Sequence, residues 1–157
     1  MEMAYIRKAV AADIPRIMEL LQQVNMVHYR LRPDLFRPYT TKYSEGELAA
    51  MLSEELQPIF VYDEGGVSGY LFGRIEEVRD ERLLRDRKTL YIDDLCVDEA
   101  ARGRHIGRQL FEYVRAYAQS IGCQALTLNV WEGNDAALRF YRALGMQVQK
   151  TCMELKI

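Results

Sequence analysis

Long apolar runs are missing from this sequence of 157 residues, and its first ten residues, MEMAYIRKAV, hold no apolar core of the kind found in signal peptides. We therefore expect a cytoplasmic protein with no membrane partner. A strong charge of either sign is missing too, because 21 Lys and Arg residues face 23 Asp and Glu residues. The resulting net charge of -2 does not favour nucleic acid as a partner.

Cysteine and histidine are scarce, which argues against several kinds of site. The cysteines are Cys96, Cys123 and Cys152; they form no CxxC pair, so neither a disulfide framework nor a zinc site is predicted. Only His28 and His105 are present, so a histidine-rich metal site is not expected. Because no histidine lies near Cys96 in the sequence to activate it, we interpret this cysteine as a small buried apolar residue rather than a nucleophile.

The chain has no internal repeat, linker or low-complexity tract that would mark a domain boundary. With 49% hydrophobic and 28% charged residues, its composition is that of an ordinary globular protein. A chain of this length can bury a substantial core. We therefore predict a single domain over residues 1–157.

The most informative stretch is residues 89–107, TLYIDDLCVDEAARGRHIG. Its first half is rich in β-branched, aromatic and aliphatic residues and predicts a buried strand with Asp93 and Asp94 in the middle. Carboxylates are costly inside a strand unless they face solvent or pair with Lys or Arg, so the pair is either structural or functional. Because side chains alternate along a strand, we expect only one of the two to face a binding cleft.

The second half of this stretch predicts a loop that opens a helix. The start of a helix leaves backbone N–H donors without intrahelical partners at the positive end of the helix dipole, where a phosphate binds well. Gly103 and Gly107 allow close approach of a ligand to the backbone, and Arg102 and Arg104 add positive charge. The Lys-Ser/Thr ending of a P-loop and the spacing of a dinucleotide fingerprint are absent, so a nucleotide-binding α/β protein is the weaker alternative.

Periodicity and turn residues along the rest of the chain predict a mixed α/β protein. A strand, helix and strand over residues 90–131 place two strands parallel through a right-handed crossover, and ligands of such units bind outside the carboxyl ends of the strands. Residues 26–43 are predicted as a structured loop. The predicted strands cover residues 5–10, 59–62, 67–77, 90–97 and 125–131, with one or two more within 146–157. Helices are predicted after a cap at Asp13, after a capping box of Ser44 and Glu47, from Ile106, and after a cap at Asn134.

The loop over residues 102–107 resembles the acyl-CoA loop of the GNAT superfamily of N-acetyltransferases. The motif of that family is Gln/Arg-x-x-Gly-x-Gly/Ala between a strand and a helix, and Arg102 and Gly107 match its first and last positions. His105 stands where the family usually has its middle glycine. We expect a helical φ at His105, which would let its N–H donate to a ligand.

Two further stretches are similar to the family and follow in the same order as in its members. They are YIDDLCV and LNVWEGNDAALRFYRALG, the second with Asn134 before an apolar helix that carries Phe140 and Tyr141 and ends at Gly145. The resemblance covers essentially the whole chain. It implies a mixed, mostly antiparallel central sheet with a parallel, splayed pair of strands and helices on both faces.

The resemblance also implies acetyl-CoA as co-substrate, with no metal. The two parallel strands would splay apart beyond Leu95, and the pantetheine arm would lie in the gap, bonded to strand backbone like an added strand. The pyrophosphate would sit on the N–H groups at the start of the helix. The residues implied to bind the cofactor are Leu95, Cys96, Val97, Arg102, Gly103, Arg104, His105, Ile106, Gly107, Arg108 and Asn134.

An acetyltransferase reaction needs a base for the ammonium of the acceptor and an acid for the leaving thiolate. The resemblance assigns the acid to Tyr141. It favours Asp93 as the base, because YIDDLCV looks like the LEDL-type strand of polyamine acetyltransferases, which has an acid at that position. Asp94, or a chain of ordered water, is the alternative.

The acceptor is left open by the sequence. We expect a primary amine on a small molecule, a polyamine or a protein, with residues 28–43 covering the acceptor side. A non-catalytic acyl-CoA-binding module is the alternative from another functional class. The apolar C-terminal strands and the habit of the family also favour a homodimer.

Overall fold

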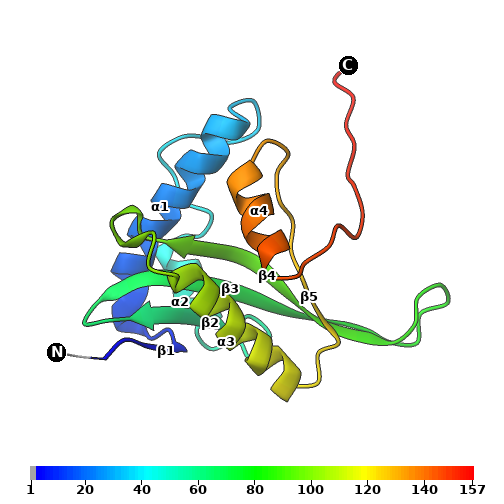
Figure 1. Ribbon diagram of the computed structural model, residues 1–157, viewed down its shortest axis with the longest axis horizontal. Coiled ribbons are helices and arrows are strands. Elements are labelled where there is room, and N and C mark those ends of the chain that lie inside the picture. Colours follow the sequence, from blue (N-terminus) through cyan, green and yellow to red (C-terminus); the bar gives the residue numbers. More distant parts are fainter. Residues whose placement is uncertain (1–2) are drawn as a thin grey trace.

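The computed structural model describes residues 3–157, so Met1 and Glu2 of the predicted domain lie outside the described residues. Within that range a five-stranded sheet has the order β1-β2-β3-β4-β5, antiparallel except for the parallel pair β4 and β5, which confirms the predicted sheet (Figure 1). The strands are β1 (Tyr5–Lys8), β2 (Ile59–Asp63), β3 (Val67–Val78), β4 (Arg87–Val97) and β5 (Ala125–Thr127). The helices are α1 (Ile14–Leu31), α2 (Glu45–Met51), α3 (Ile106–Ser120) and α4 (Asp135–Ala143), with 3-10 turns η1 (Ala11–Asp13) and η2 (Glu99–Ala101).

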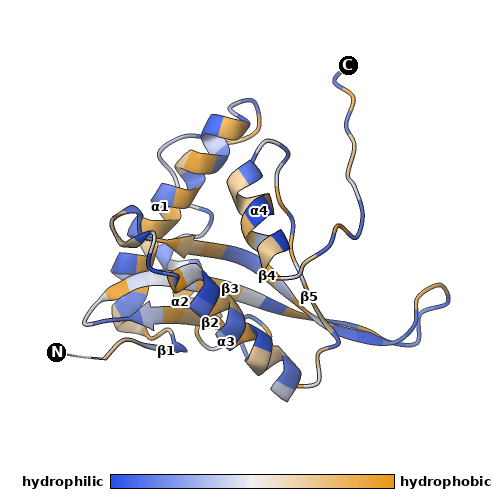
Figure 2. Ribbon diagram, in the orientation of Figure 1, coloured by the Kyte–Doolittle hydropathy of each residue, from blue (hydrophilic) through white to orange (hydrophobic). Residues whose placement is uncertain are grey.

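Two apolar cores lie on opposite faces of the sheet. On the first face, α1 and α2 bury Ile17, Leu20 and Leu48 against Tyr70 and Phe72 of β3. On the second, α3 packs its apolar stripe against the sheet, and α4 adds partly buried side chains; this core contains Leu71, Leu90, Ile92, Ile106, Leu110 and Val114. Each helix is apolar on one side only, and that side packs against the sheet. The sheet therefore separates the two cores. Figure 2 shows that the far end of the β3–β4 hairpin, beyond both cores, is hydrophilic.

Local signals explain most of the element ends. The Ser44 hydroxyl accepts from the Glu47 N–H at 3.1 Å while the Glu47 carboxylate accepts from the Ser44 N–H at 3.0 Å, so the predicted capping box is confirmed. The prediction that the Asp13 side chain caps α1 is wrong, because this side chain makes no capping hydrogen bond to the helix. Its carboxylate accepts instead from the Arg7 guanidinium at 2.7 and 2.9 Å and from the Val10 N–H.

Three predicted element ranges differ from the structure. Residues 26–31 belong to α1 rather than to a loop, because the helix continues to Leu31. The strand predicted over 125–131 ends at Thr127. The strands predicted within 146–157 are wrong as a description of the isolated chain, because this segment is extended, lies on no sheet and runs away from the body of the molecule (Figure 1).

No helix within residues 3–157 combines the length and the apolar character needed to span a bilayer.

Candidate active site

A β-bulge interrupts β4 at its two carboxylates. Phe72 of β3 lies opposite Asp94, whereas the next residue, Gly73, lies opposite Ile92, so Asp93 is an extra residue on β4. A bulge of this kind resets the alternation of side chains along a strand. The prediction that Asp93 and Asp94 point to opposite faces is therefore wrong.

The contacts of the two carboxylates place them on the same face, the one covered by α1 and α2. Asp93 accepts a hydrogen bond from the Tyr43 hydroxyl, and Asp94 accepts one from the Tyr70 hydroxyl at 2.7 Å. Both tyrosine rings pack on Phe72, with ring centroids 5.6 and 4.7 Å away. Two acids, two phenols and one buried ring thus form a single cluster.

The environments of the two acids differ. The Lys42 ammonium donates to Asp93 Oδ1 at 2.8 Å, which places a positive charge against that carboxylate. Asp94 has no ion pair among the described residues, and its burial raises its pKa to about 6, although the Tyr70 hydroxyl opposes this shift. Burial and the charge of Asp94 in turn raise the pKa of Tyr70. Asp94 therefore exchanges its proton nearer to neutral pH than an ordinary aspartate does.

The edge of β4 toward β5 is paired only at its start. Three residue pairs join the strands, Thr89 with Ala125, Leu90 with Leu126 and Tyr91 with Thr127. The predicted separation of the strands beyond Leu95 therefore begins four residues earlier, after Tyr91. From Ile92 to Val97 this edge is free of strand pairing within the described chain, so an extended ligand can bond to it as an added strand.

The loop after β4 opens α3, as predicted. Its last residue, His105, has φ 60° and ψ 22°, so the expected helical φ is wrong and the backbone is left-handed. Glycine adopts this conformation without strain, whereas other residues do so at a cost. Across the described residues, the backbone N–H groups from Arg102 to Arg108 donate no hydrogen bond to a protein acceptor.

Gly107 lies where the open edge of β4, the start of α3 and α4 meet. A Cβ at this position would lie 3.3 Å from Phe140 of α4 and 3.6 Å from both Leu95 and Val97 of β4. The absence of a side chain therefore lets the first turn of α3 approach both elements closely. The free amides at the start of α3 therefore lie close to both β4 and α4.

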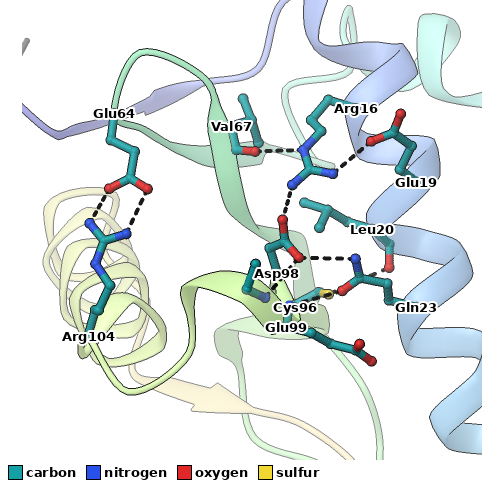
Figure 3. Close-up of polar contacts among 11 residues, drawn as sticks. Arg16, Glu19, Leu20, Gln23, Glu64, Val67, Cys96, Asp98, Glu99 and Arg104 are labelled. Atoms are coloured by element: carbon teal, nitrogen blue, oxygen red, sulfur yellow. Dashed lines mark hydrogen bonds and ion pairs between the residues drawn. The ribbon is translucent and has the colours of Figure 1, made fainter.

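Side chains from distant parts of the chain hold this loop (Figure 3). Arg104 forms a two-pronged ion pair with Glu64 in the β2–β3 turn, one branch of which is 2.9 Å long. The Arg104 guanidinium is thus occupied, whereas Arg102 and Arg108 are exposed and form no ion pair within the described residues. The free positive charge predicted at the loop comes from these two arginines.

A second set of contacts ties the end of β4 to α1 (Figure 3). Arg16 donates to the Val67 carbonyl at 2.9 Å and pairs with Asp98, the residue that follows β4. Gln23 donates to Asp98 at 3.2 Å and accepts from the Glu99 N–H at 3.2 Å. The sequence did not identify this set; the only local signal was an acid at the start of a short helical turn.

Tyr141 lies on α4, half-buried against Phe140 and Phe111, with ring centroids 5.0 and 6.3 Å away. Its hydroxyl makes no hydrogen bond to the part of the chain that the structure describes. Burial raises the pKa of Tyr141, and the charge of Asp94 raises it further. The phenol is therefore fully protonated at neutral pH and within electrostatic reach of Asp94.

Two other predicted residues have well-defined surroundings. The Asn134 side chain accepts from the Ala137 N–H at 3.2 Å, so its role as the cap of α4 is confirmed. Cys96 is buried, its thiol donates to the Leu20 carbonyl at 3.5 Å, and burial raises its pKa to about 12. A thiol with this pKa is a poor nucleophile, which agrees with the interpretation of Cys96 as a packing residue.

The predicted acceptor side packs against the segment that follows β5. The Phe36 ring contacts Trp131 edge-on at 5.4 Å, and the Arg32 guanidinium lies 5.9 Å from the same ring. Lys42 and Tyr43, at the other end of this loop, reach Asp93. The loop therefore borders the carboxylate cluster. Among residues 3–157, no group of three or more His, Cys, Asp or Glu side chains could hold a metal ion.

Comparisons with known proteins agree with the fold. A model described as Acetyltransferase (GNAT) family matches residues 19–146. A mutant of the BH1408 protein from Bacillus halodurans, of known crystal structure, superposes with a TM-score of 0.93 and 34% sequence identity, over 98% of this chain and 99% of that one.

Two curated proteins are similar over part of this chain. An uncharacterized N-acetyltransferase of Lactobacillus delbrueckii subsp. lactis is 30% identical over 87 residues, which are 55% of this chain and 49% of that protein. The spermine/spermidine N(1)-acetyltransferase of Bacillus subtilis is 24% identical over 93 residues, 58% of this chain and 59% of that protein. The chain thus spans about half the length of the curated relatives it matches.

Proposed function

The chain belongs to the GNAT acetyltransferase family, and we propose that it is an acetyl-CoA-dependent N-acetyltransferase that acts as a single domain over residues 1–157. The acetyl group passes from acetyl-CoA to a primary amine by direct attack of the amine on the thioester. One observation carries the proposal: the free edge of β4 and the free amides at the start of α3 meet at Gly107, where a Cβ would lie 3.3 Å from Phe140, the residue before the protonated phenol of Tyr141.

The cofactor is assigned to the gap that opens between the parallel strands β4 and β5 where their pairing stops. Backbone groups of β4 over Leu95, Cys96 and Val97 would bond the pantetheine arm, because this edge lacks strand pairing within the described chain. The backbone N–H groups from Arg102 to Arg108 have no hydrogen-bond acceptor within the described chain. They would therefore donate to the oxygens of the diphosphate. Arg102 and Arg108 supply free charge, while Arg104 fixes the loop through Glu64.

The base is assigned to the pair of carboxylates. Asp93, favoured from the sequence, already accepts hydrogen bonds from Lys42 and Tyr43. Asp94 has a pKa of about 6, so it is ionised at neutral pH and binds a proton more readily than an ordinary carboxylate. We therefore assign proton acceptance to Asp94, with Asp93 as a neighbouring carboxylate that keeps the site attractive to an ammonium group.

The acid is assigned to Tyr141. As the amine nitrogen bonds to the thioester carbon, the carbon–sulfur bond breaks and the thiolate takes the phenolic proton. The proton lost by the amine goes to Asp94, so charge is conserved. An N–H on the open edge of β4 would stabilise the developing oxyanion.

A polyamine is the first acceptor class to test. The carboxylate cluster attracts cationic amines, and the Bacillus subtilis relative is named for its action on spermine and spermidine. A small monoamine or a protein amine stays in the proposal as the wider class. The cytoplasmic location is kept as a prediction of the sequence.

The test is thiol release from acetyl-CoA with a panel of amines that includes spermidine, small monoamines and lysine peptides. We expect turnover with at least one of them and a kcat for Tyr141→Phe that is lower by about 10²–10³-fold, because the phenylalanine ring keeps its packing but cannot donate a proton. Calorimetry should show CoA affinity unchanged within about threefold.

Tyr113→Phe is the matched control, because Tyr113 is an exposed tyrosine on α3 that contacts Phe60 and lies outside the proposed site. It should keep the wild-type kcat. Tight CoA binding without turnover on any amine would instead indicate a non-catalytic acyl-CoA-binding module. Absence of CoA binding would refute both readings.

A further inference from the structure

The ammonium group of Lys42 occupies a site suited to a primary amine. Its Nζ lies 2.8 Å from Asp93 Oδ1, 3.2 Å from the Asp93 carbonyl oxygen and 5.7 Å from the centre of the Tyr43 ring. A carboxylate, a carbonyl and the face of an aromatic ring are groups that attract an alkylammonium ion. The Asp93 side chain is only 9% exposed, so the ammonium is held against a largely buried acid. The chain thus presents one of its own amines to the carboxylate cluster.

The backbone next to Lys42 is fixed, whereas the lysine side chain is only partly covered. The Tyr43 hydroxyl donates to Asp93, and the Tyr43 ring stacks on Phe72 with the ring centroids 5.6 Å apart. The Thr41 hydroxyl donates to the Tyr43 carbonyl at 2.8 Å. The Lys42 side chain is 45% exposed, and its four-carbon stem is flexible. Its nitrogen can therefore move within the cluster without leaving it, which replaces an encounter in solution by an internal one.

The same amine lies within electrostatic reach of the groups that the proposed reaction uses. Burial raises the pKa of Asp94 to about 6, and the charge of Lys42 opposes this shift. Burial also raises the pKa of Tyr141, and the charge of Asp94 raises it further. An amine, a carboxylate and a protonated phenol thus form a connected set. These are the three groups that the transfer of an acetyl group to an amine requires.

We propose that Lys42 is a site of self-acetylation, at which the lysine nitrogen takes the acetyl group of bound acetyl-CoA when no other amine is present. This reaction rests on the proposed function, because it uses the same co-substrate and the same groups. The Lys42 ammonium gives one proton to Asp94, and the neutral nitrogen bonds to the thioester carbon. The carbon–sulfur bond breaks, the thiolate takes the phenolic proton of Tyr141, and the second proton of the nitrogen restores the phenol. The products are Nε-acetyllysine, CoA and one proton, which Asp94 releases to solvent.

The other lysines of the chain supply internal comparisons. They are Lys8, Lys88, Lys150 and Lys156. Lys150 is exposed and forms no ion pair within the described residues, so it reports uncatalysed acetylation by acetyl-CoA. Lys156 pairs with Asp34 at 3.3 Å on the surface, so it reports the effect of an ion pair alone. Neither contacts the carboxylate cluster.

Incubation of the full chain with acetyl-CoA and no added amine, followed by mass spectrometry of its peptides, tests the proposal. We expect acetylation at Lys42 with an initial rate at least tenfold higher than at Lys150 or Lys156. The rate constant at Lys42 should not change with protein concentration, because the reaction is internal. An excess of CoA should slow the reaction at Lys42 and leave that at Lys150 unchanged. Lys42→Arg, which offers no amine, should gain no acetyl group at this position.

Tyr141→Phe separates catalysis from chemical acetylation. This variant should lower the rate at Lys42 at least tenfold, and Tyr113→Phe should leave it unchanged. Equal rates at Lys42 and Lys150, or a rate at Lys42 that Tyr141→Phe does not lower, would overturn the proposal. Turnover of an amine from the panel without modification of Lys42 would overturn self-acetylation alone. Absence of both reactions would overturn the proposed enzymatic function as well.

Discussion

The two edges of β4 differ in how far each is paired with a neighbouring strand. Along one edge, ten residue pairs join β4 to β3 from Gly69 to Val78. Along the other, pairing with β5 covers only three residues and stops at Tyr91. One edge has its backbone groups satisfied within the protein, whereas the second half of the other leaves them for a ligand. A single strand can thus form both a fixed wall and a binding cleft.

The difference between the edges also explains where the carboxylates lie. The bulge at Asp93 is tolerated because the pairing with β3 continues on both sides of it. It brings Asp93 and Asp94 together level with the open part of the other edge. The pairing of β4 with β3 therefore fixes the position of Asp93 and Asp94 beside the unpaired part of the opposite edge.

The largest expected effect comes from Asp94→Asn, which removes the base from the carboxylate cluster. We expect kcat to fall about 10²–10³-fold, because an amide cannot accept the proton. In the wild type, kcat should decline as the pH falls below about 6, where Asp94 becomes protonated. A pH–rate profile checks this. If Asp93→Asn abolishes the acid limb and Asp94→Asn keeps it, the assignment is reversed.

Asp94→Asn should also change the free energy of unfolding. The pKa of Asp94 is raised in the folded protein from an ordinary value of 3.8 to about 6, so the folded state binds more protons between these values. Its contribution to the free energy of unfolding thus declines as the pH rises through that window. Asp94→Asn should raise the free energy of unfolding at pH 7 by about 1–2 kcal/mol.

A smaller effect is expected on the paired edge from Gly69→Ala. The added Cβ would lie 3.1 Å from the Cys96 carbonyl oxygen and 3.2 Å from both Ile106 and Leu110, so β4 or α3 must shift. We expect the free energy of unfolding in urea to fall by about 1–3 kcal/mol. At temperatures where the variant stays folded, kcat should change little.

Gly66→Ala is the control for this prediction, because a Cβ there meets no atom within 4 Å. Its free energy of unfolding should stay within about 0.5 kcal/mol of the wild type. Equal destabilisation by both substitutions would mean that the close contact of β3 with β4 and α3 is not the cause.

The smallest effect is expected at the start of α3, from His105→Gly. Replacing a left-handed histidine by glycine relieves backbone strain, partly offset by the greater freedom of glycine in the unfolded chain. We expect a gain of about 0.5–1 kcal/mol in the free energy of unfolding, with CoA affinity preserved. His105→Ala, which keeps the strain, should show no such gain. A loss of stability in His105→Gly would indicate that the imidazole itself holds the loop.

The sequence predicted those features that depend on neighbouring residues. The strand with two acids, the helix that begins after the arginine loop and the cap at Asn134 are all local patterns, and the structure confirms them. The bulge at Asp93 depends on the register with β3, and the partner of Arg104 is Glu64, 40 residues away. Such features depend on contacts between distant segments, so alternation and spacing within one strand could not reveal them.

The extra residue at Asp93 changes which residues of β4, even-numbered or odd-numbered, face each side of the sheet. Before it, Leu90 and Ile92 line the core under α3, and after it the odd-numbered Leu95 and Val97 line that same core. If β4 kept all its residues but paired with β3 without the bulge, the two linings would be exchanged beyond Asp93, sending Leu95 toward α1 and Cys96 toward α3. The bulge therefore decides which core each of the later side chains of β4 enters.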